Sequence, residues 1–131
     1  MRALVVEDEA ALREGLRAQL VEQGFTVDIA ADGNEGLFAG SEYPLDIAVI
    51  DLGLPKISGL EVLRQFRNNP SSSSIPVVVL TTSAEDRDIE EAYKLGCNSY
   101  IVKPVEFNKF MEVAAQIEVY WCLLNTTPRP V

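Results

Sequence analysis

The segment LDIAVID, residues 45–51, is apolar on both faces apart from Asp46, and it ends at a second acid, Asp51. Further along the chain, the segment IPVVVL, residues 75–80, is the most apolar strand-like run. Near-continuous apolar runs of this length are typical of strands in a parallel sheet that helices cover on both faces. Both segments therefore predict central strands, and the first of them places a carboxylate at its carboxyl end.

Outward from this pair, the sequence alternates short β runs with helical stretches. Further strands are expected at residues 4–6, 25–30 and 99–102, and residues 25–30 alternate as an edge strand does. Apolar residues spaced three or four apart predict five helices, at residues 9–22, 32–41, around 60–66, 83–96 and 106–124. Five strands that alternate with five helices predict an α/β fold, a doubly wound parallel sheet with right-handed crossovers.

Residues at the expected helix ends support these boundaries. Asp8 can cap the first helix, and Gly24 suits the left-handed residue that ends it. Asp32 and Glu35 form a capping-box pattern for the second helix, and Ser83 stands at the start of the fourth.

The composition excludes several classes of function. The chain has 131 residues, a net charge of −9 and no histidine, which excludes histidine bases and histidine-containing zinc sites. Its acidity disfavours direct binding of nucleic acid. No apolar stretch reaches the roughly 20 residues that cross a bilayer, so no membrane contact is expected. Cys97 and Cys122 are expected to be free thiols in a reducing, cytoplasmic setting.

Residues that carry chemistry collect at one edge of the predicted sheet. In a doubly wound sheet, ligands bind beyond the carboxyl ends of the strands. Five candidates fall at those ends: Glu7, Asp8, Asp51, Thr81 and Lys103. Because they come from four separate segments, their convergence is stronger evidence for a site than any one of them.

These side chains can support phosphoryl chemistry. Three converging carboxylates repel one another, and Mg²⁺ relieves that repulsion with oxygen ligands. The Asp51 carboxylate can attack a phosphoryl group to form an acyl phosphate, while a metal ion and Lys103 neutralise the transferred charge. Singly, each residue has a plainer explanation: Asp8 as a helix cap, Thr81 as a strand residue and Lys103 as a solvated turn residue.

Five segments together resemble the receiver domain of bacterial two-component response regulators. They are VVEDE (residues 5–9), VIDLGLP (49–55), Ser58-Gly59, VLTT (79–82) and VKP (102–104). The resemblance covers roughly residues 2–120. It implies a flavodoxin-like fold with strand order 2-1-3-4-5, in which a sensor histidine kinase, or a small donor such as acetyl phosphate, phosphorylates Asp51.

The resemblance also implies a role for each matching position. Glu7, Asp8 and Asp51 are implied to hold Mg²⁺ together with the backbone carbonyl of Gly53. Thr81 and Lys103 are implied to bind the phosphoryl group, with a cis bond between Lys103 and Pro104.

The same resemblance implies a conformational switch and a rate of dephosphorylation. Phosphorylation would pull Thr81 inward and let Tyr100 turn in after it, which reshapes the face of the fourth helix, fifth strand and fifth helix. The alternative for Tyr100 is a half-buried strand tyrosine. Gly53 and Ser83 stand where the family tunes dephosphorylation, and neither supplies an amide or carboxylate. We therefore expect slow autodephosphorylation, and a phosphoryl acceptor rather than an enzyme.

The two halves of the chain resemble different subfamilies. Residues 1–67 are similar to receivers of winged-helix transcription factors, whereas residues 68–131 are similar to single-domain regulators that partner phytochromes. This contrast predicts a chimera joined near residues 66–75, which as an engineered protein would have no physiological role; the alternative is a natural divergent receiver. The receiver is expected to occupy residues 1–124, followed by a loose tail at 125–131 and no effector domain.

The last helix is unusually apolar toward its end, at Phe107, Phe110, Val113, Ile117, Tyr120, Trp121, Leu123 and Leu124. An exposed apolar surface favours a partner. In phytochrome-associated regulators a similar extension contributes to a homodimer, so we expect a homodimer through the fourth helix, fifth strand, fifth helix and this extension. The alternative is that Trp121 and Leu124 fold back on their own domain.

Two other functions compete with this interpretation. A phosphatase or phosphotransferase with an aspartate at a strand end usually places a general-acid aspartate two residues later, where this chain has Gly53. A scaffold of the pseudo-receiver type would bind partners without phosphorylation, but the complete set of acids, Thr81 and Lys103 argues against it.

Overall fold

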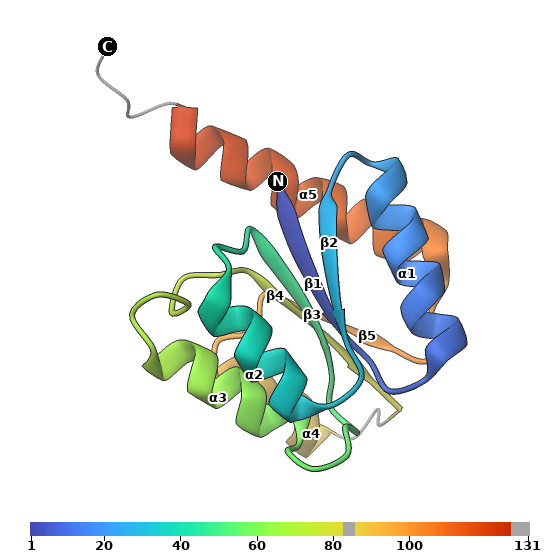
Figure 1. The fold of residues 1–131 in the computed structure, drawn as a ribbon, viewed down its shortest axis with the longest axis vertical. Coiled ribbons are helices and arrows are strands. Elements are labelled where there is room, and N and C mark those ends of the chain that lie inside the picture. The colour runs from blue at the N-terminus through green and yellow to red at the C-terminus, as the bar shows by residue number, and fades with distance from the viewer. Residues whose placement is uncertain (83–85, 127–131) are drawn as a thin grey trace.

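The computed structural model describes the backbone of residues 1–82 and 86–126 and the side chains of residues 1–82 and 87–117. Its centre is one sheet of five parallel strands in the order β2-β1-β3-β4-β5 (Figure 1). The strands are β1 (Arg2–Val6), β2 (Thr26–Ala30), β3 (Ile47–Asp51), β4 (Val77–Thr81) and β5 (Ser99–Val102). The predicted α/β fold and the strand order implied by the resemblance are both confirmed.

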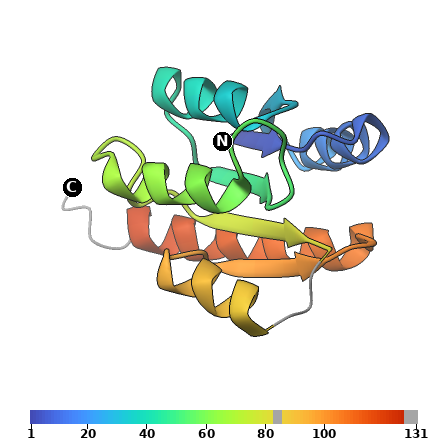
Figure 2. The same ribbon diagram turned by 90° about the horizontal axis from the view of Figure 1, so that it is seen from below.

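Helices cover both faces of this sheet. They are α1 (Ala10–Glu22), α2 (Gly33–Glu42), α3 (Gly59–Asn68), α4 (Asp86–Lys94) and α5 (Phe107–Thr126). Helices α1 and α5 lie on one face, and α2, α3 and α4 lie on the other (Figures 1 and 2). The sheet is therefore the middle of three layers.

Two apolar cores lie on either side of the sheet because side chains alternate along each strand. Leu16, Leu20 and Phe110 fill the core under α1 and α5. Val62 and Phe66 of α3 fill the other core. Strands β3 and β4 are buried along their whole length, as their apolar runs predicted, whereas the edge strand β2 is largely accessible. This rigid centre fixes the carboxyl ends of the strands.

Most of the predicted helix ends are confirmed, and one is wrong. The side chain of Asp32 accepts a hydrogen bond from the Glu35 amide, and Gly24 has a left-handed φ of 99°. Helix α1, however, has Glu9 at its N-cap, and no side chain caps it. The predicted cap by Asp8 is therefore wrong, because Asp8 lies beside the other carboxylates instead. The cap predicted at Ser83 lies outside the described residues.

Helix α5 is less exposed in its first half than the sequence suggested. Phe110 is fully buried, and Val113 and Ile117 pack against the same core. The expectation that Phe110 belongs to an exposed apolar surface is wrong, since α5 turns that side chain toward the sheet. Phe107 is 37% exposed. The side chains of residues 118–126 and the tail at 127–131 lie outside the described part of the chain.

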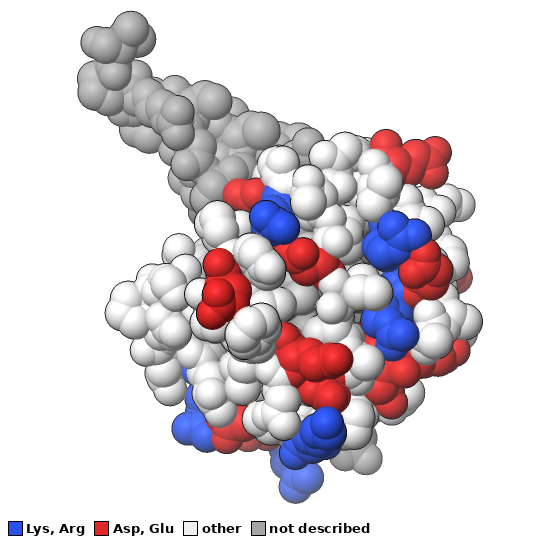
Figure 3. Space-filling view, in the orientation of Figure 1, with Lys and Arg blue, Asp and Glu red and all other residues white. Residues whose placement is uncertain are grey.

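The surface carries mixed charges. Figure 3 shows Lys and Arg side chains scattered among Asp and Glu, without a continuous basic patch among the described residues of this face. Within the described residues, no helix has the length and apolarity needed to cross a bilayer.

Candidate functional site

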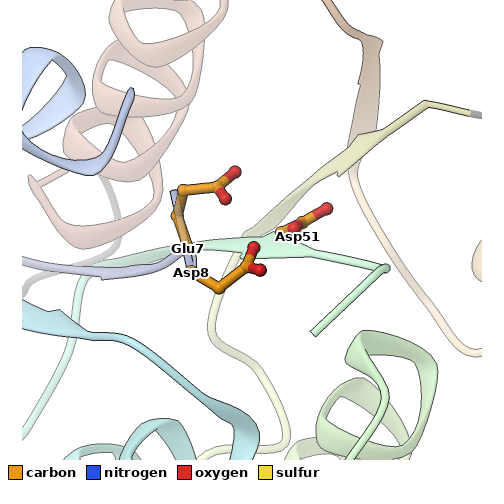
Figure 4. A group of neighbouring side chains, drawn as sticks. All are labelled: Glu7, Asp8 and Asp51. Atoms are coloured by element: carbon orange, nitrogen blue, oxygen red, sulfur yellow. The ribbon is translucent and has the colours of Figure 1, made fainter. Parts of the chain in front are cut away.

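The acidic residues singled out from the sequence meet at the carboxyl edge of the sheet. Glu7 and Asp8 follow β1, and Asp51 ends the neighbouring strand β3, so the parallel pairing of β1 with β3 brings them together. One carboxylate oxygen from each residue lies within 4.8 Å of the others (Figure 4). Glu7 is fully buried and Asp51 is 4% exposed, whereas Asp8 is exposed to solvent. The cluster is therefore open on one side.

Lys103 completes the site from the end of β5. Its Nζ lies 2.7 Å from Glu7 Oε1 and 3.3 Å from Asp51 Oδ2. Glu7 Oε1 accepts no hydrogen bond of regular geometry among the described residues, so this short ion pair is its main electrostatic partner. One ammonium thus faces two buried carboxylates.

Backbone hydrogen bonds hold these residues in place. Glu7 N donates to Ala30 O at 3.0 Å, and Lys103 N donates to Thr81 O at 2.7 Å. These bonds carry the ladder one residue beyond each strand, so the side chains project from ordered backbone rather than from free loops. The bond between Lys103 and Pro104 is cis, as the resemblance implied.

A close backbone approach sets the position of the loop after Asp51. Gly59, the first residue of α3, donates its N–H to Leu52 O at 3.1 Å. A Cβ at Gly59 would lie 2.1 Å from Asp51 O, a distance that no side chain tolerates. Gly59 therefore lets α3 begin directly against the strand end that carries Asp51.

Burial governs the protonation of the two inner acids. Desolvation raises the pKa of Glu7 above its usual range, although the ion pair with Lys103 opposes this shift. Desolvation likewise raises the pKa of Asp51, against the opposing effects of the Gly53 amide and Lys103. Both carboxylates therefore hold a proton more readily than they would in solution.

The pKa values of Asp8 and Lys103 shift in the direction opposite to the effect of desolvation. For Asp8, desolvation raises the pKa, but hydrogen bonds with Glu7 and Asp51 outweigh it and lower the pKa overall. For Lys103, desolvation lowers the pKa, but the bonds with Glu7 and Asp51 outweigh it and raise the pKa overall. Their partners thus favour the charged forms of Asp8 and of Lys103.

The cluster fits a divalent cation. Three carboxylates and one ammonium leave an excess of negative charge when all four groups are ionised, and a cation that binds oxygen removes that excess. Glu7 Oε1, buried and without a regular hydrogen bond, is a ready ligand atom. The solvent-exposed side at Asp8 gives an ion a way in.

The remaining predicted site residues surround this cluster. Thr81 is 5% exposed at the end of β4, and the amide of Gly53 donates to Asp51 Oδ1 at 3.2 Å. Tyr100, on β5, is half-buried and packs edge-on against Tyr93 of α4, with ring centroids 5.9 Å apart. Ser83 lies outside the described residues.

Two residues near the site were not predicted from the sequence. The guanidinium of Arg13 donates to the backbone carbonyl of Glu7 at 2.9 Å, which supports the loop that carries the acids. Asp88 of α4 lines a pocket together with Gly53 and Thr81. Neither belongs to a recognisable motif, because each reaches the site only through the packing of its helix.

Comparison with known proteins agrees with this geometry. A family model described as the response regulator receiver domain matches residues 3–115. The chain is 45% identical over 109 residues to the two-component response regulator PhoP of Pseudomonas aeruginosa, covering 83% of this chain and 48% of that protein. The chain therefore spans about half the length of the curated relatives it matches.

Two solved structures extend the comparison. The chemotaxis response regulator CheY4 of Vibrio cholerae has a TM-score of 0.83 at 24% identity, covering 88% of this chain and 97% of that one, and supports the fold alone. The response regulator TrrA of Thermotoga maritima, in complex with Mg²⁺ and BeF, has a TM-score of 0.77 at 30% identity, covering 88% of this chain and 97% of that one.

Proposed function

The chain belongs to the family of response regulator receiver domains of two-component systems, and from this premise we propose that Asp51 is its phosphoryl acceptor. The observation that carries the proposal is the ion pair of Lys103 with both Glu7 and Asp51. That arrangement places a positive charge beside the nucleophile and a cation site on its open side. The same groups can neutralise a transferred phosphoryl group.

The proposed roles follow from position. Glu7, Asp8 and Asp51 would hold Mg²⁺ with the backbone carbonyl of Gly53, and the bound ion supplies charge neutralisation for the phosphoryl oxygens. Lys103 leaves its contact with Asp51 to bind the transferred group. The hydroxyl of Thr81, at the neighbouring strand end, donates to it.

The output of the proposed switch is a change of surface. Thr81 and Tyr100 lie on adjacent strands, and Tyr100 is in contact with α4 through Tyr93. A movement of Thr81 toward the phosphoryl group opens space for Tyr100 and alters the face of α4, β5 and α5. We propose that this face and the C-terminal part of α5 form a homodimer.

The proposed partner upstream is a sensor histidine kinase in the cytoplasm. Gly53 offers no side chain to orient an attacking water, so we propose a long-lived phosphoryl group. In this role the chain is an acceptor of phosphoryl groups and has no other substrate.

Intact-mass spectrometry tests the central proposal. The wild-type protein, incubated with acetyl phosphate and Mg²⁺, should gain the mass of one phosphoryl group, and Asp51→Asn should gain none. Asp46→Asn is the matched control, because Asp46 precedes β3 at the opposite end of the strand and pairs with the Arg2 amide. A wild-type protein that stays unmodified would favour the scaffold instead.

A further inference from the structure

A second feature of the site is a pocket of about 240 Å³ beside Asp51. It lies between the ends of β3 and β4, the start of α3 and the first turns of α4. Its lining residues are Leu52, Gly53, Leu60, Thr81, Thr82 and Asp88. All of these are uncharged except Asp88.

Asp88 faces this pocket without a counter-charge. It is partly buried, and it has no ion pair or hydrogen bond with any described residue. Among the described residues, no side chain closes the space beside Gly53, where the atoms nearest to a Cβ are the Asp51 carboxylate oxygens at 3.9 and 4.0 Å. Within the described part of the chain, the pocket therefore combines access to the nucleophile with the negative charge of Asp88.

The chemistry of phosphoryl transfer shows what this charge can distinguish. When an Asp51 oxygen attacks phosphorus, an O–P bond forms and the bond to the leaving group breaks, with its electron pair going to the leaving group. With phosphoramidate as donor, the P–N bond breaks and ammonia leaves. Its nitrogen is protonated and carries a positive charge before the transfer. Acetyl phosphate breaks a P–O bond and releases acetate, which gains a negative charge.

A carboxylate near the leaving group affects these two donors in opposite directions. It attracts the nitrogen that carries positive charge and repels the oxygen on which negative charge develops. Its repulsion of the phosphoryl group itself is common to both donors. The ratio of the two rates therefore isolates the effect of Asp88 on the leaving group.

We propose that Asp88 makes this pocket selective for phosphodonors with a P–N bond over acyl phosphates. The inference rests on the proposed phosphorylation of Asp51 and names the class of donor that this site takes most readily. Asp88 is a specificity-determining residue, since it acts through charge and touches neither Asp51 nor the cation cluster. A phosphohistidine, which loses imidazole through the same kind of bond, belongs to the favoured class.

The test compares phosphoramidate with acetyl phosphate on the full chain. The rate of Asp51 phosphorylation with each donor and Mg²⁺ is followed by intact mass in the wild type, Asp88→Asn and Asp88→Lys. Removal of the charge should lower the ratio of the phosphoramidate rate to the acetyl phosphate rate about two- to five-fold. Asp88→Lys should lower it further, and added salt should shrink both effects.

Glu90→Gln is the matched control. Glu90 lies two residues along the same helix, is exposed, and does not line the pocket, so the same loss of charge there should leave the ratio unchanged. Equal ratios in the wild type and both Asp88 variants, with phosphorylation intact, overturn this inference alone. If neither donor modifies the wild type, the proposed function fails and the inference falls with it.

Discussion

The ammonium of Lys103 lies 2.7 Å from Oε1 of Glu7, a carboxylate with no exposed surface. Lys103 also pairs with Asp51 at 3.3 Å. Both acids belong to the cluster that fits a divalent cation, so Lys103 and a bound ion would draw on the same carboxylates. Two positive charges beside the same carboxylates repel each other, so Lys103 and a bound cation compete for Glu7 and Asp51.

Replacement of Lys103 by Met should strengthen Mg²⁺ binding and weaken phosphorylation. The ion gains carboxylates that the ammonium no longer holds, so its affinity should rise about three- to ten-fold, as expected for one nearby charge. Titration calorimetry measures the affinity, and intact mass measures phosphorylation. Lys109→Met is the control, because Lys109 is 74% exposed and its one ion pair with a described residue is the exposed pair with Glu106. A fall in Mg²⁺ affinity in Lys103→Met would contradict the shared-ligand model.

The affinity for Mg²⁺ should fall as the pH is lowered. Burial raises the pKa of Glu7 and of Asp51, so protons compete with the ion at a higher pH than they would at free carboxylates. Binding should release protons in the pH window just above the ordinary carboxyl pKa. Calorimetry in buffers of different ionisation enthalpy counts these protons. An affinity that is flat across this window would show that both acids are already ionised.

Asp51→Asn should stabilise the metal-free protein at neutral pH by about 1 kcal/mol, as expected when a buried carboxylate that carries a desolvation cost is removed. The folded-state pKa of Asp51 is raised, so its contribution to stability is present below the unfolded-state pKa and is lost as the pH rises through the folded-state value. The stability of the variant should therefore exceed that of the wild type most at pH values above the folded-state pKa of Asp51. Urea unfolding in a chelator at several pH values measures this. A variant that is less stable than the wild type at neutral pH would refute it.

Arg67 should contribute strongly to stability through backbone carbonyls rather than through an acid. Its guanidinium donates to Ile75 O and to Gly96 O, each at 2.7 Å, and burial lowers its pKa. Arg67→Ala should cost about 2–3 kcal/mol of unfolding free energy, because it removes charge-assisted hydrogen bonds to the partly buried Ile75 carbonyl and to Gly96 O. Arg64→Ala is the control, since Arg64 is 55% exposed and pairs with Glu61 within the same helix. Equal losses of unfolding free energy in the two variants would contradict this.

Two glycines beside Asp51 should respond very differently to alanine. At Gly59 a Cβ would lie 2.1 Å from Asp51 O, whereas at Gly53 the nearest atom is 3.9 Å away. Gly59→Ala should destabilise the fold by about 3 kcal/mol and slow phosphorylation, because the start of α3 must move away from the strand end. Gly53→Ala should change stability by less than about 0.5 kcal/mol. Thermal unfolding and intact mass compare the pair, and a tolerated Gly59→Ala would be the contrary result.

Several features were predictable because local chemistry decides them. The apolar runs before Asp51 and Thr81 predicted buried parallel strands, and both are fully buried. Gly24 predicted the left-handed end of α1. The burial of Phe110 in helix α5 was harder to predict, since a phenylalanine in the sequence looks the same whether its side chain faces solvent or the sheet. The direction of that side chain depends on how the helix rotates against β-strands far away in sequence.

By itself, the sequence determined which residues could form a phosphoryl site, because Glu7, Asp51, Thr81 and Lys103 stand at the ends of apolar strands, where ligands of such sheets bind. Only the tertiary structure decided how those residues interact. The pairing of β1 with β3 buries Glu7 beside Asp51, and the placement of β5 brings Lys103 between them. The packing of α4 turns Asp88 into the wall of the adjoining pocket. Burial and charge separation depend on distance in space, and distance in sequence does not specify them.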